Sequence, residues 1–88
     1  MRVLFSPQGW EDFGYWRQTD AKIEKKIRKL IEECRRHPFD GTGKPEGLKG
    51  DLTGFWSRRI TSEHRLVYRV TGKGTGQTLE IAQARYHY

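Results

Sequence analysis

The chain has 88 residues, so we expect residues 1–88 to fold as a single small domain with a modest core. Charged residues make up 32% of the chain and apolar residues 34%, but three Trp, four Tyr and four Phe supply enough area to bury, which argues against disorder. The formal net charge of +6 favours a polyanionic partner: nucleic acid, an acidic protein or, as the least favoured of the three, a membrane surface.

The N-terminal residues predict a strand followed by a helix. Residues 1–5 are a short apolar run, which we interpret as a strand. Ser6 is a good N-cap and Pro7 suits the first helical position, so the helix begins there and ends near Gln18. Gly9 and Gly14 weaken this helix, and packing of its apolar face must hold it. That face carries Trp10, Phe13 and Trp16.

A second helix is predicted after Thr19 or Asp20 and ends at His37, because the residue before Pro38 is pushed out of the helical conformation. Apolar residues recur at helical spacing, which predicts a helix with one buried side. This stripe consists of Ile23, Ile27, Leu30, Ile31 and Cys34. The opposite side carries Lys22, Lys25, Lys26, Arg28, Lys29, Arg35 and Arg36.

The second half of the chain predicts a glycine-rich loop over 39–51 and three strands over 52–60, 64–71 and 78–85. Short turns between strands favour antiparallel pairs. Leu66, Tyr68 and Val70 alternate with Arg65 and Arg69, so the arginines belong to the opposite face of the sheet. We therefore expect an α+β domain with two helices on one face of an antiparallel sheet and the arginines on the open face. The same alternation puts Arg58 on one face with Trp56 and Ile60.

Several kinds of site are disfavoured by the residues. Three histidines and one cysteine without ligand spacing predict no metal site, and no motif calls for a cofactor. Cys34 lies on the apolar stripe and is expected to be a small buried side chain. One cysteine cannot form an internal disulfide, and no apolar run reaches transmembrane length. We therefore expect a cytoplasmic protein that is not inserted in a membrane.

Acid–base groups and cations remain as candidates for chemistry. Glu46 lies in the loop between lysines and can act as a base, Arg65 can stabilise a phosphate, and His87 can donate a proton. Together they suffice to cleave RNA through its own 2′-hydroxyl. The residues alone leave other interpretations open: Glu46 balances its neighbouring lysines, or His87 and Tyr88 form a frayed terminus. Without further information, they indicate a basic α+β domain and leave RNA binding as one option.

Four segments of the sequence form a pattern: KPEGLK (44–49), GFWSRRIT (54–61), EHRLVY (63–68) and ARYHY (84–88). This pattern resembles the YoeB toxins of the RelE/ParE superfamily of bacterial toxin–antitoxin systems. The aromatic residues of the first helix fit the same pattern, and the resemblance extends over nearly the whole chain. The turn over 72–77 is longer and richer in glycine than the family pattern. The resemblance implies a twisted antiparallel sheet with two N-terminal helices packed on one face.

The resemblance also implies a function and a site. The family consists of metal-independent endoribonucleases that cleave messenger RNA in the ribosomal A site and so inhibit translation. Its catalytic residues correspond to Glu46, Arg65, His87 and Tyr88. Positions suited to RNA or ribosome contact are Lys44, Lys49, Arg58, Arg59 and His64. The implied partners are the 70S ribosome with its mRNA and a YefM-like antitoxin with an acidic C-terminal segment; toxin homodimers also occur in the family.

Two alternative functions remain open, and the proposed active site sets one requirement on the path of the last strand. The alternatives are a ParE-like toxin that poisons a topoisomerase by binding and a non-catalytic RNA- or ribosome-binding module. The condition concerns the last strand, since a regular strand through residue 88 would turn His87 toward the helices and Tyr88 away from them. For both to act at one site, the chain must bulge or leave the strand by about residue 86.

Overall fold

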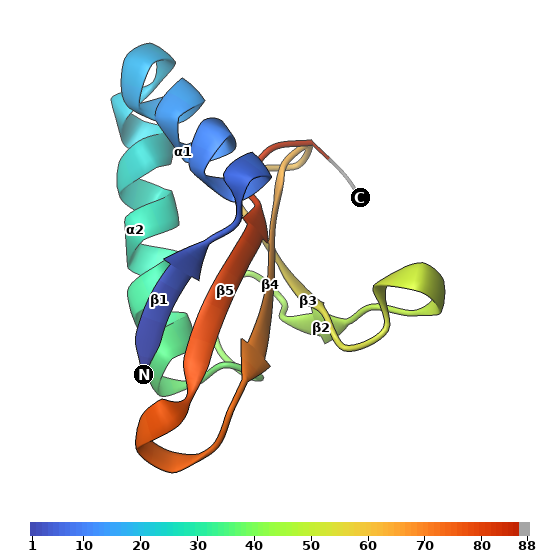
Figure 1. The fold of residues 1–88 in the computed structure, drawn as a ribbon. Coiled ribbons are helices and arrows are strands. Elements are labelled where there is room, and N and C mark those ends of the chain that lie inside the picture. Colours follow the sequence, from blue (N-terminus) through green and yellow to red (C-terminus); the bar gives the residue numbers. More distant parts are fainter. Residues whose placement is uncertain (87–88) are drawn as a thin grey trace.

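The computed structural model describes residues 1–86, and His87 and Tyr88 lie outside the described residues. Two helices pack on one side of an open five-stranded sheet (Figure 1). The helices are α1 (Pro7–Thr19) and α2 (Ala21–Arg36). The strands are β1 (Arg2–Phe5), β2 (Glu46–Gly47), β3 (Trp56–Arg59), β4 (Arg65–Thr71) and β5 (Thr78–Gln83), and short 3₁₀ turns occupy Gly50–Leu52 and Gly74–Gly76.

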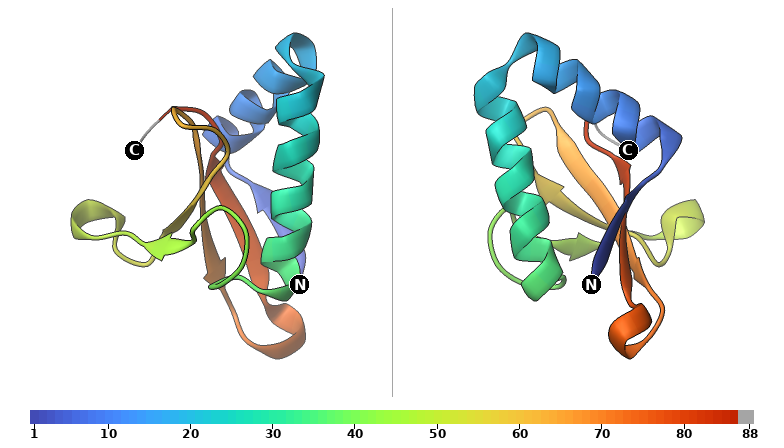
Figure 2. Two further views of the ribbon diagram at one scale, coloured as in Figure 1. Left: turned by 180° about the vertical axis from the view of Figure 1, so that it is seen from behind. Right: turned by 60° about the vertical axis from the view of Figure 1, so that its left-hand side comes forward.

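The sheet is mixed, with the strand order β1-β5-β4-β3-β2. The pairs β2–β3, β3–β4 and β4–β5 are antiparallel, as the short turns predict, but β1 runs parallel to β5. The expectation of a purely antiparallel sheet was therefore wrong for the first strand. The two helices between β1 and the rest of the sheet form a long connection that lets β1 reach the far edge in parallel orientation. The α+β class and the helices on one face are confirmed (Figure 2).

Capping residues set the ends of both helices. The Ser6 hydroxyl accepts the Gly9 N–H at 3.0 Å, with Pro7 in the first position of α1. The Asp20 carboxylate accepts the N–H groups of Lys22 and Ile23 at 3.1 and 3.2 Å, so it starts α2 directly after α1 ends. Both helices thus begin at residues that the sequence predicts.

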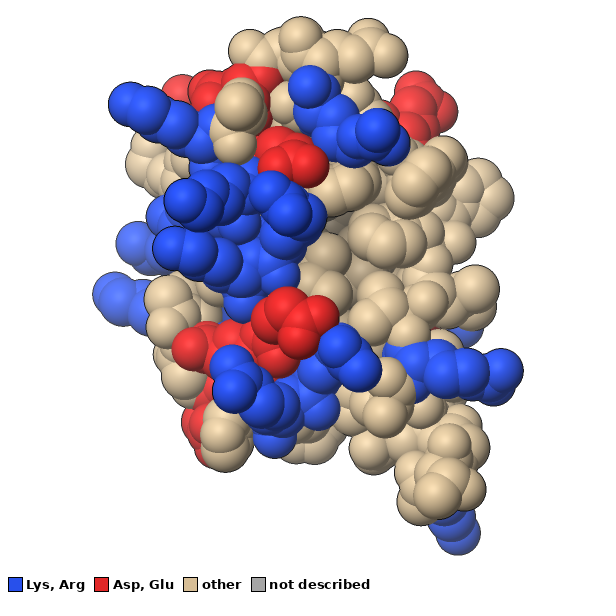
Figure 3. All heavy atoms as spheres, turned by 90° about the vertical axis from the view of Figure 1, so that its left-hand side faces the viewer, with Lys and Arg blue, Asp and Glu red and all other residues tan. Residues whose placement is uncertain are grey.

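The core lies between the helices and one face of the sheet. The predicted stripe of α2 is buried at Ile27, Leu30, Ile31 and Cys34. Leu66, Tyr68, Leu79 and Ile81 are all fully buried on the facing side of the sheet. The exposed side of α2 is strongly basic, and Figure 3 shows lysines and arginines gathered over the helical side of the molecule.

Several strand boundaries differ from the predicted ones. The strand predicted over 52–60 begins only at Trp56, because Leu52 ends a 3₁₀ turn, and the two-residue strand β2 was not predicted. β5 ends at Gln83 instead of Arg85. The pairing of β4 with β5 shifts at Ala82, since Val67 pairs with Gln83 while Tyr68 pairs with Ile81. The predicted bulge or exit from the strand before residue 86 is therefore confirmed.

The two glycines of α1 lead to opposite stability predictions. A Cβ at Gly9 would lie 2.3 Å from the Ile81 carbonyl oxygen, so Gly9→Ala should force α1 away from β5 and cost about 1–3 kcal/mol. A Cβ at Gly14 meets nothing within 4 Å, so Gly14→Ala should stabilise the protein by about 0.5–1 kcal/mol. Urea unfolding of both variants checks this, and shifts in the same direction would contradict the packing of α1 on β5.

Candidate active site

Cross-strand pairing places the predicted acid and arginines on one face of the sheet. Glu46 pairs with Ser57 and Ser57 with Val67, so these side chains form a row on the side away from the helices. One step along, Arg59 pairs with Arg65 on the same face. Standard strand spacing puts the Cα atoms of Glu46 and Arg65 roughly 12 Å apart. The structure thus brings Glu46, Arg59 and Arg65 together, from positions 19 residues apart in the sequence.

This face is less exposed than the sequence predicts. Glu46 and Arg59 are exposed, but Arg65 is only 9% exposed and Val67 only 1%. Nη1 of Arg65 donates to the carbonyl oxygens of Thr61 at 2.9 Å, Ser62 at 3.3 Å and His64 at 3.1 Å. The β3–β4 turn therefore curls around its own arginine and fixes the orientation of the guanidinium.

The end of the described chain is attached to this turn. The Arg65 N–H donates to the Tyr86 carbonyl at 3.1 Å, and the Tyr86 N–H donates to Nδ1 of His64 at 2.8 Å. Both ribbon figures show the C-terminal segment running beside the β3–β4 turn (Figures 1 and 2). His87 and Tyr88, the predicted general acid and its neighbour, follow Tyr86 in the sequence but lie outside the described residues.

Helix α1 holds the residues just before Tyr86, a role that sequence reasoning missed. The buried Asp12 carboxylate accepts the Ala84 N–H at 2.9 Å, and the Trp16 indole N–H donates to the Ala84 carbonyl at 2.8 Å. Ala84 lies just beyond the end of β5, and these two side chains bind its N–H and carbonyl groups in place of a neighbouring strand. The sequence did offer one signal for this role: Asp12, an acidic residue four positions before Trp16, falls on the apolar face of the predicted helix. A carboxylate placed there needs a hydrogen-bond donor.

Lysines flank the acidic residue on β2. Lys44 and Lys49 are both exposed and lie on either side of Glu46 in the sequence. Lys44 has a left-handed backbone with φ 51°, and the Gly43 carbonyl just before it accepts the Arg59 N–H at 2.7 Å. The loop thus joins the sheet edge immediately before Glu46, beside Arg59.

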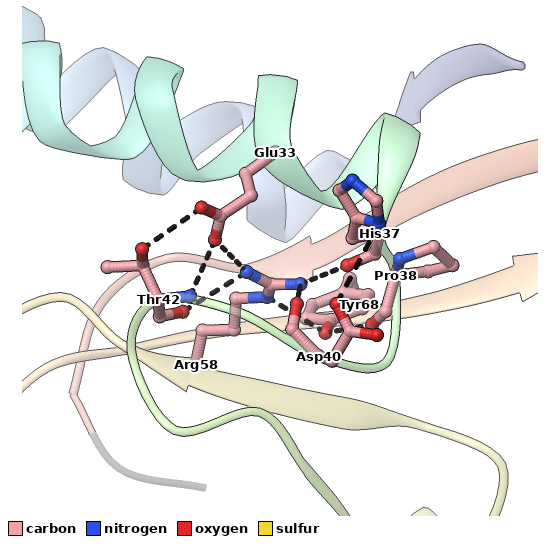
Figure 4. A network of polar contacts seen from close by, with 7 residues as sticks. All are labelled: Glu33, His37, Pro38, Asp40, Thr42, Arg58 and Tyr68. Carbon is pink, nitrogen blue, oxygen red and sulfur yellow. Dashed lines mark hydrogen bonds and ion pairs between the residues drawn. The ribbon is translucent and has the colours of Figure 1, made fainter.

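Arg58 does not belong to this face, and its predicted contact with RNA or the ribosome is corrected. Its side chain is fully buried on the helix side of the sheet, because strand alternation puts it with Ile60 instead of Arg59. Figure 4 shows the guanidinium enclosed by polar partners. It donates to Glu33 Oε2 at 2.5 Å, the Thr42 carbonyl at 3.1 Å, the Asp40 carbonyl at 2.7 Å, the Tyr68 hydroxyl at 3.2 Å and the His37 carbonyl.

This buried guanidinium fastens the segment 37–43 to the sheet. Three of its partners are main-chain carbonyls of that segment, and Tyr68 adds a fourth tie by donating to the Pro38 carbonyl at 2.6 Å. The segment leads directly into β2. Arg58 therefore sets the path of the chain that delivers Glu46 to the opposite face.

The surroundings of Arg58 shift the pKa values of several groups. Burial raises the pKa of the Tyr68 hydroxyl to about 12 and that of the Cys34 thiol to about 11, so both are protonated at neutral pH. Hydrogen bonds from the Thr42 N–H, the Thr42 hydroxyl and Arg58 lower the pKa of Glu33. Cys34, fully buried and protonated, is an unreactive core side chain.

Metal and membrane sites find no support within residues 1–86. No three His, Cys, Asp or Glu side chains in this part of the chain cluster closely enough to hold a metal ion. Neither helix of the described chain has the length and apolar character needed to cross a bilayer.

Two helices against one side of a five-stranded mixed sheet form the fold that is seen in YoeB and RelE-like toxin structures. Residues 5–88 match the family model described as a YoeB-like toxin of bacterial type II toxin–antitoxin systems. The chain is 56% identical to Toxin YoeB of Escherichia coli K12 over 88 residues, which cover all of both proteins. It therefore belongs to the YoeB-like toxins, as the resemblance predicts.

Solved structures agree with this assignment. The YoeB/ParE toxin from Agrobacterium tumefaciens superposes with a TM-score of 0.97 at 52% identity, with all of both chains covered. The YoeB dimer from Staphylococcus aureus gives a TM-score of 0.88 at 46% identity, covering 100% of this chain and 98% of that one. A heterotetrameric complex of YoeB with YefM from the same organism gives 0.87 at 46% identity, with the same coverage.

Removing the buried guanidinium should destabilise the fold strongly. Arg58→Met leaves the Glu33 carboxylate and several carbonyls without their donor, so we expect a loss of about 3–5 kcal/mol in the free energy of unfolding. The matched control is Arg59→Met on the exposed face, which should change it by less than about 0.5 kcal/mol. Urea unfolding measures both, and equal losses would contradict the structural role assigned to Arg58.

The lowered pKa of Glu33 predicts a stability difference that depends on pH. Because the folded-state pKa lies below the ordinary value of 4.5, the carboxylate stabilises the fold above pH 4.5 and loses this effect as the pH falls through the folded-state pKa. Glu33→Gln should therefore be less stable than the native protein at pH 7, with the gap closing in acid. Urea unfolding from pH 7 to pH 3 tests this, with Glu32→Gln as the exposed control. A gap that stays constant over this range would refute it.

Proposed function

We propose that this protein is a ribosome-dependent endoribonuclease that cleaves mRNA in the A site and thereby inhibits translation, as the toxin of its toxin–antitoxin system. The observation that carries the proposal is the strand register that puts Glu46, Arg59 and Arg65 on one face of the sheet. A carboxylate on one strand and an arginine two strands away leave room between them for the phosphate and ribose of one nucleotide.

The proposed reaction needs no metal ion, cofactor or protein nucleophile. Glu46 removes the proton from the ribose 2′-hydroxyl, and the 2′-oxygen attacks the adjacent phosphorus. Arg65 stabilises the charge that develops on the phosphate oxygens. His87 protonates the departing 5′-oxygen, so the products are a 2′,3′-cyclic phosphate and a free 5′-hydroxyl. Tyr88 completes the proposed catalytic set.

The fixed position of Arg65 supports its assigned role. Three turn carbonyls hold one of its amino groups, and low exposure keeps water away from the guanidinium. A donor that is already oriented does not have to reorganise when charge develops in the transition state. Arg65 therefore suits transition-state stabilisation better than the exposed Arg59, to which we assign binding of the RNA backbone.

Other cations are proposed to contact RNA or the ribosome. Lys44 and Lys49 keep this assignment because they are exposed on either side of Glu46. The YoeB of S. aureus forms a complex with YefM and also a dimer. By analogy we propose a YefM-like antitoxin with an acidic segment as partner of this chain, together with the 70S ribosome and homodimer formation. A function on ribosomes implies a cytoplasmic location.

The decisive experiment uses translating ribosomes with a defined message and maps cleavage by primer extension. The native protein should cut within the A-site codon, whereas Glu46→Ala, Glu46→Gln and His87→Ala should each lower the single-turnover rate by at least about 100-fold, as expected for loss of a general base or acid. Free mRNA and a DNA analogue of the codon should stay intact, since the latter lacks the attacking hydroxyl.

A matched control separates catalysis from charge. Glu11→Gln removes one carboxylate from the exposed surface of α1 and should leave the rate unchanged. Arrest of translation with an intact message would overturn the ribonuclease proposal in favour of a toxin that acts by occupancy. Inhibition of a topoisomerase without effect on ribosomes would favour the ParE-like alternative.

A further inference from the structure

Tyr86 adopts a backbone conformation that a bulky side chain avoids. Its φ is 62°, in the left-handed region, which residues with a side chain rarely adopt. The conformation turns the chain away from the direction of β5, which ends at Gln83. Such strain persists only where neighbouring contacts hold it, so the contacts of Tyr86 identify what directs the chain end.

Two hydrogen bonds hold the Tyr86 backbone, and one of them comes from a side chain. Its carbonyl accepts the Arg65 N–H at 3.1 Å, and its own N–H donates to Nδ1 of His64 at 2.8 Å. A ring nitrogen accepts a hydrogen bond only when it carries no proton. Since Nδ1 accepts the Tyr86 N–H, Nε2 is the ring atom that is left to act as a donor.

Aromatic packing fixes the orientation of this imidazole. The Trp16 ring meets it edge-on with centroids 4.8 Å apart, and the Tyr86 ring lies 5.4 Å away on another side. Trp16 also binds the Ala84 carbonyl, so the same side chain orients His64 and holds the chain two residues before Tyr86. The Nδ1 atom is thus directed at the backbone, not at solvent.

We propose that His64 is a positioning residue of the toxin, which acts through Nδ1 on the Tyr86 backbone and so fixes the chain beside Arg65 at the residue that precedes His87 in the sequence. This inference rests on the proposed function, in which His87 is the general acid. It replaces the sequence-based expectation that His64 contacts RNA. Tyr86 keeps its left-handed conformation because His64, a side-chain acceptor at the β3–β4 turn, binds its N–H.

Two amide substitutions distinguish the two ring nitrogens. In Asn the side-chain oxygen is bonded to Cγ, as Nδ1 is, whereas in Gln the amide reaches the position of Nε2. His64→Asn should therefore keep the single-turnover cleavage rate on programmed ribosomes within about threefold of the native rate, while His64→Gln should lose about tenfold or more, the equivalent of one hydrogen bond. Both variants lack the ring, so the lost aromatic packing is matched. The reverse order, with Gln active and Asn impaired, would show that His64 acts through Nε2 and would overturn the proposal.

A second readout does not depend on catalysis. The ¹⁵N spectrum of the native imidazole at pH 8 should show the proton on Nε2, and exchange of the Tyr86 amide hydrogen should be slow in the native protein and in His64→Asn but fast in His64→Gln. Equal exchange in both variants would refute the positioning role even if the ribonuclease function stands. If exchange follows the expected order but the native protein does not cut mRNA, the proposed function fails and the anchoring of Tyr86 remains.

Discussion

The burial of one guanidinium constrains much of this structure. Arg58 is fully buried, and a charge in such a place is tolerated only when its donors are satisfied. Its partners come from three separate parts of the chain: Glu33 on α2, Tyr68 on β4 and the carbonyls of the segment 37–43. A helix, the sheet and the loop before β2 are therefore held by a single side chain.

The two adjacent arginines of β3 lie on opposite faces of the sheet and have different roles. Arg58 points toward the helices and fixes the loop, while Arg59 points the other way, beside Arg65. The alternation of a strand makes this division unavoidable, because neighbouring residues must face opposite sides. The structural arginine and the arginine available to a ligand are thus consecutive in sequence but separated by the thickness of the sheet.

Periodicity was sufficient to predict the parts of the fold with a strong amphipathic pattern. The stripe of α2, the caps Ser6 and Asp20, and the inward face of β4 followed directly from residue spacing. The parallel pairing of β1 with β5 could not be predicted locally, because it depends on how the helices return the chain to the sheet. The strand β2 was missed because two residues carry no periodic signal.

The candidate site was predictable in its residue types and less so in its surroundings. Alternation along β4 indicated the face of Arg65, but its burial by the carbonyls of its own turn had no counterpart in the pattern. Alternation along β3 put Arg58 on the same face as Ile60 and so indicated that it is buried. Only the family resemblance suggested that Arg58 contacts RNA. The contact between Asp12 and Ala84 spans 72 residues and follows only from tertiary structure.

The parallel pairing of β1 with β5 also governs the order in which the chain can fold. The first residue of β1, Arg2, pairs with Thr78, which lies 76 positions further along the chain, so β1 has no partner in the sheet until β5 has been synthesised. The hydrogen bonds of Asp12 and Trp16 with the Ala84 backbone likewise cannot form until Ala84 has been synthesised. Contacts between such distant residues close late and slowly. The surroundings of Arg65, whose N–H binds the Tyr86 carbonyl, can therefore form only after β4, β5 and the segment that follows them have been synthesised.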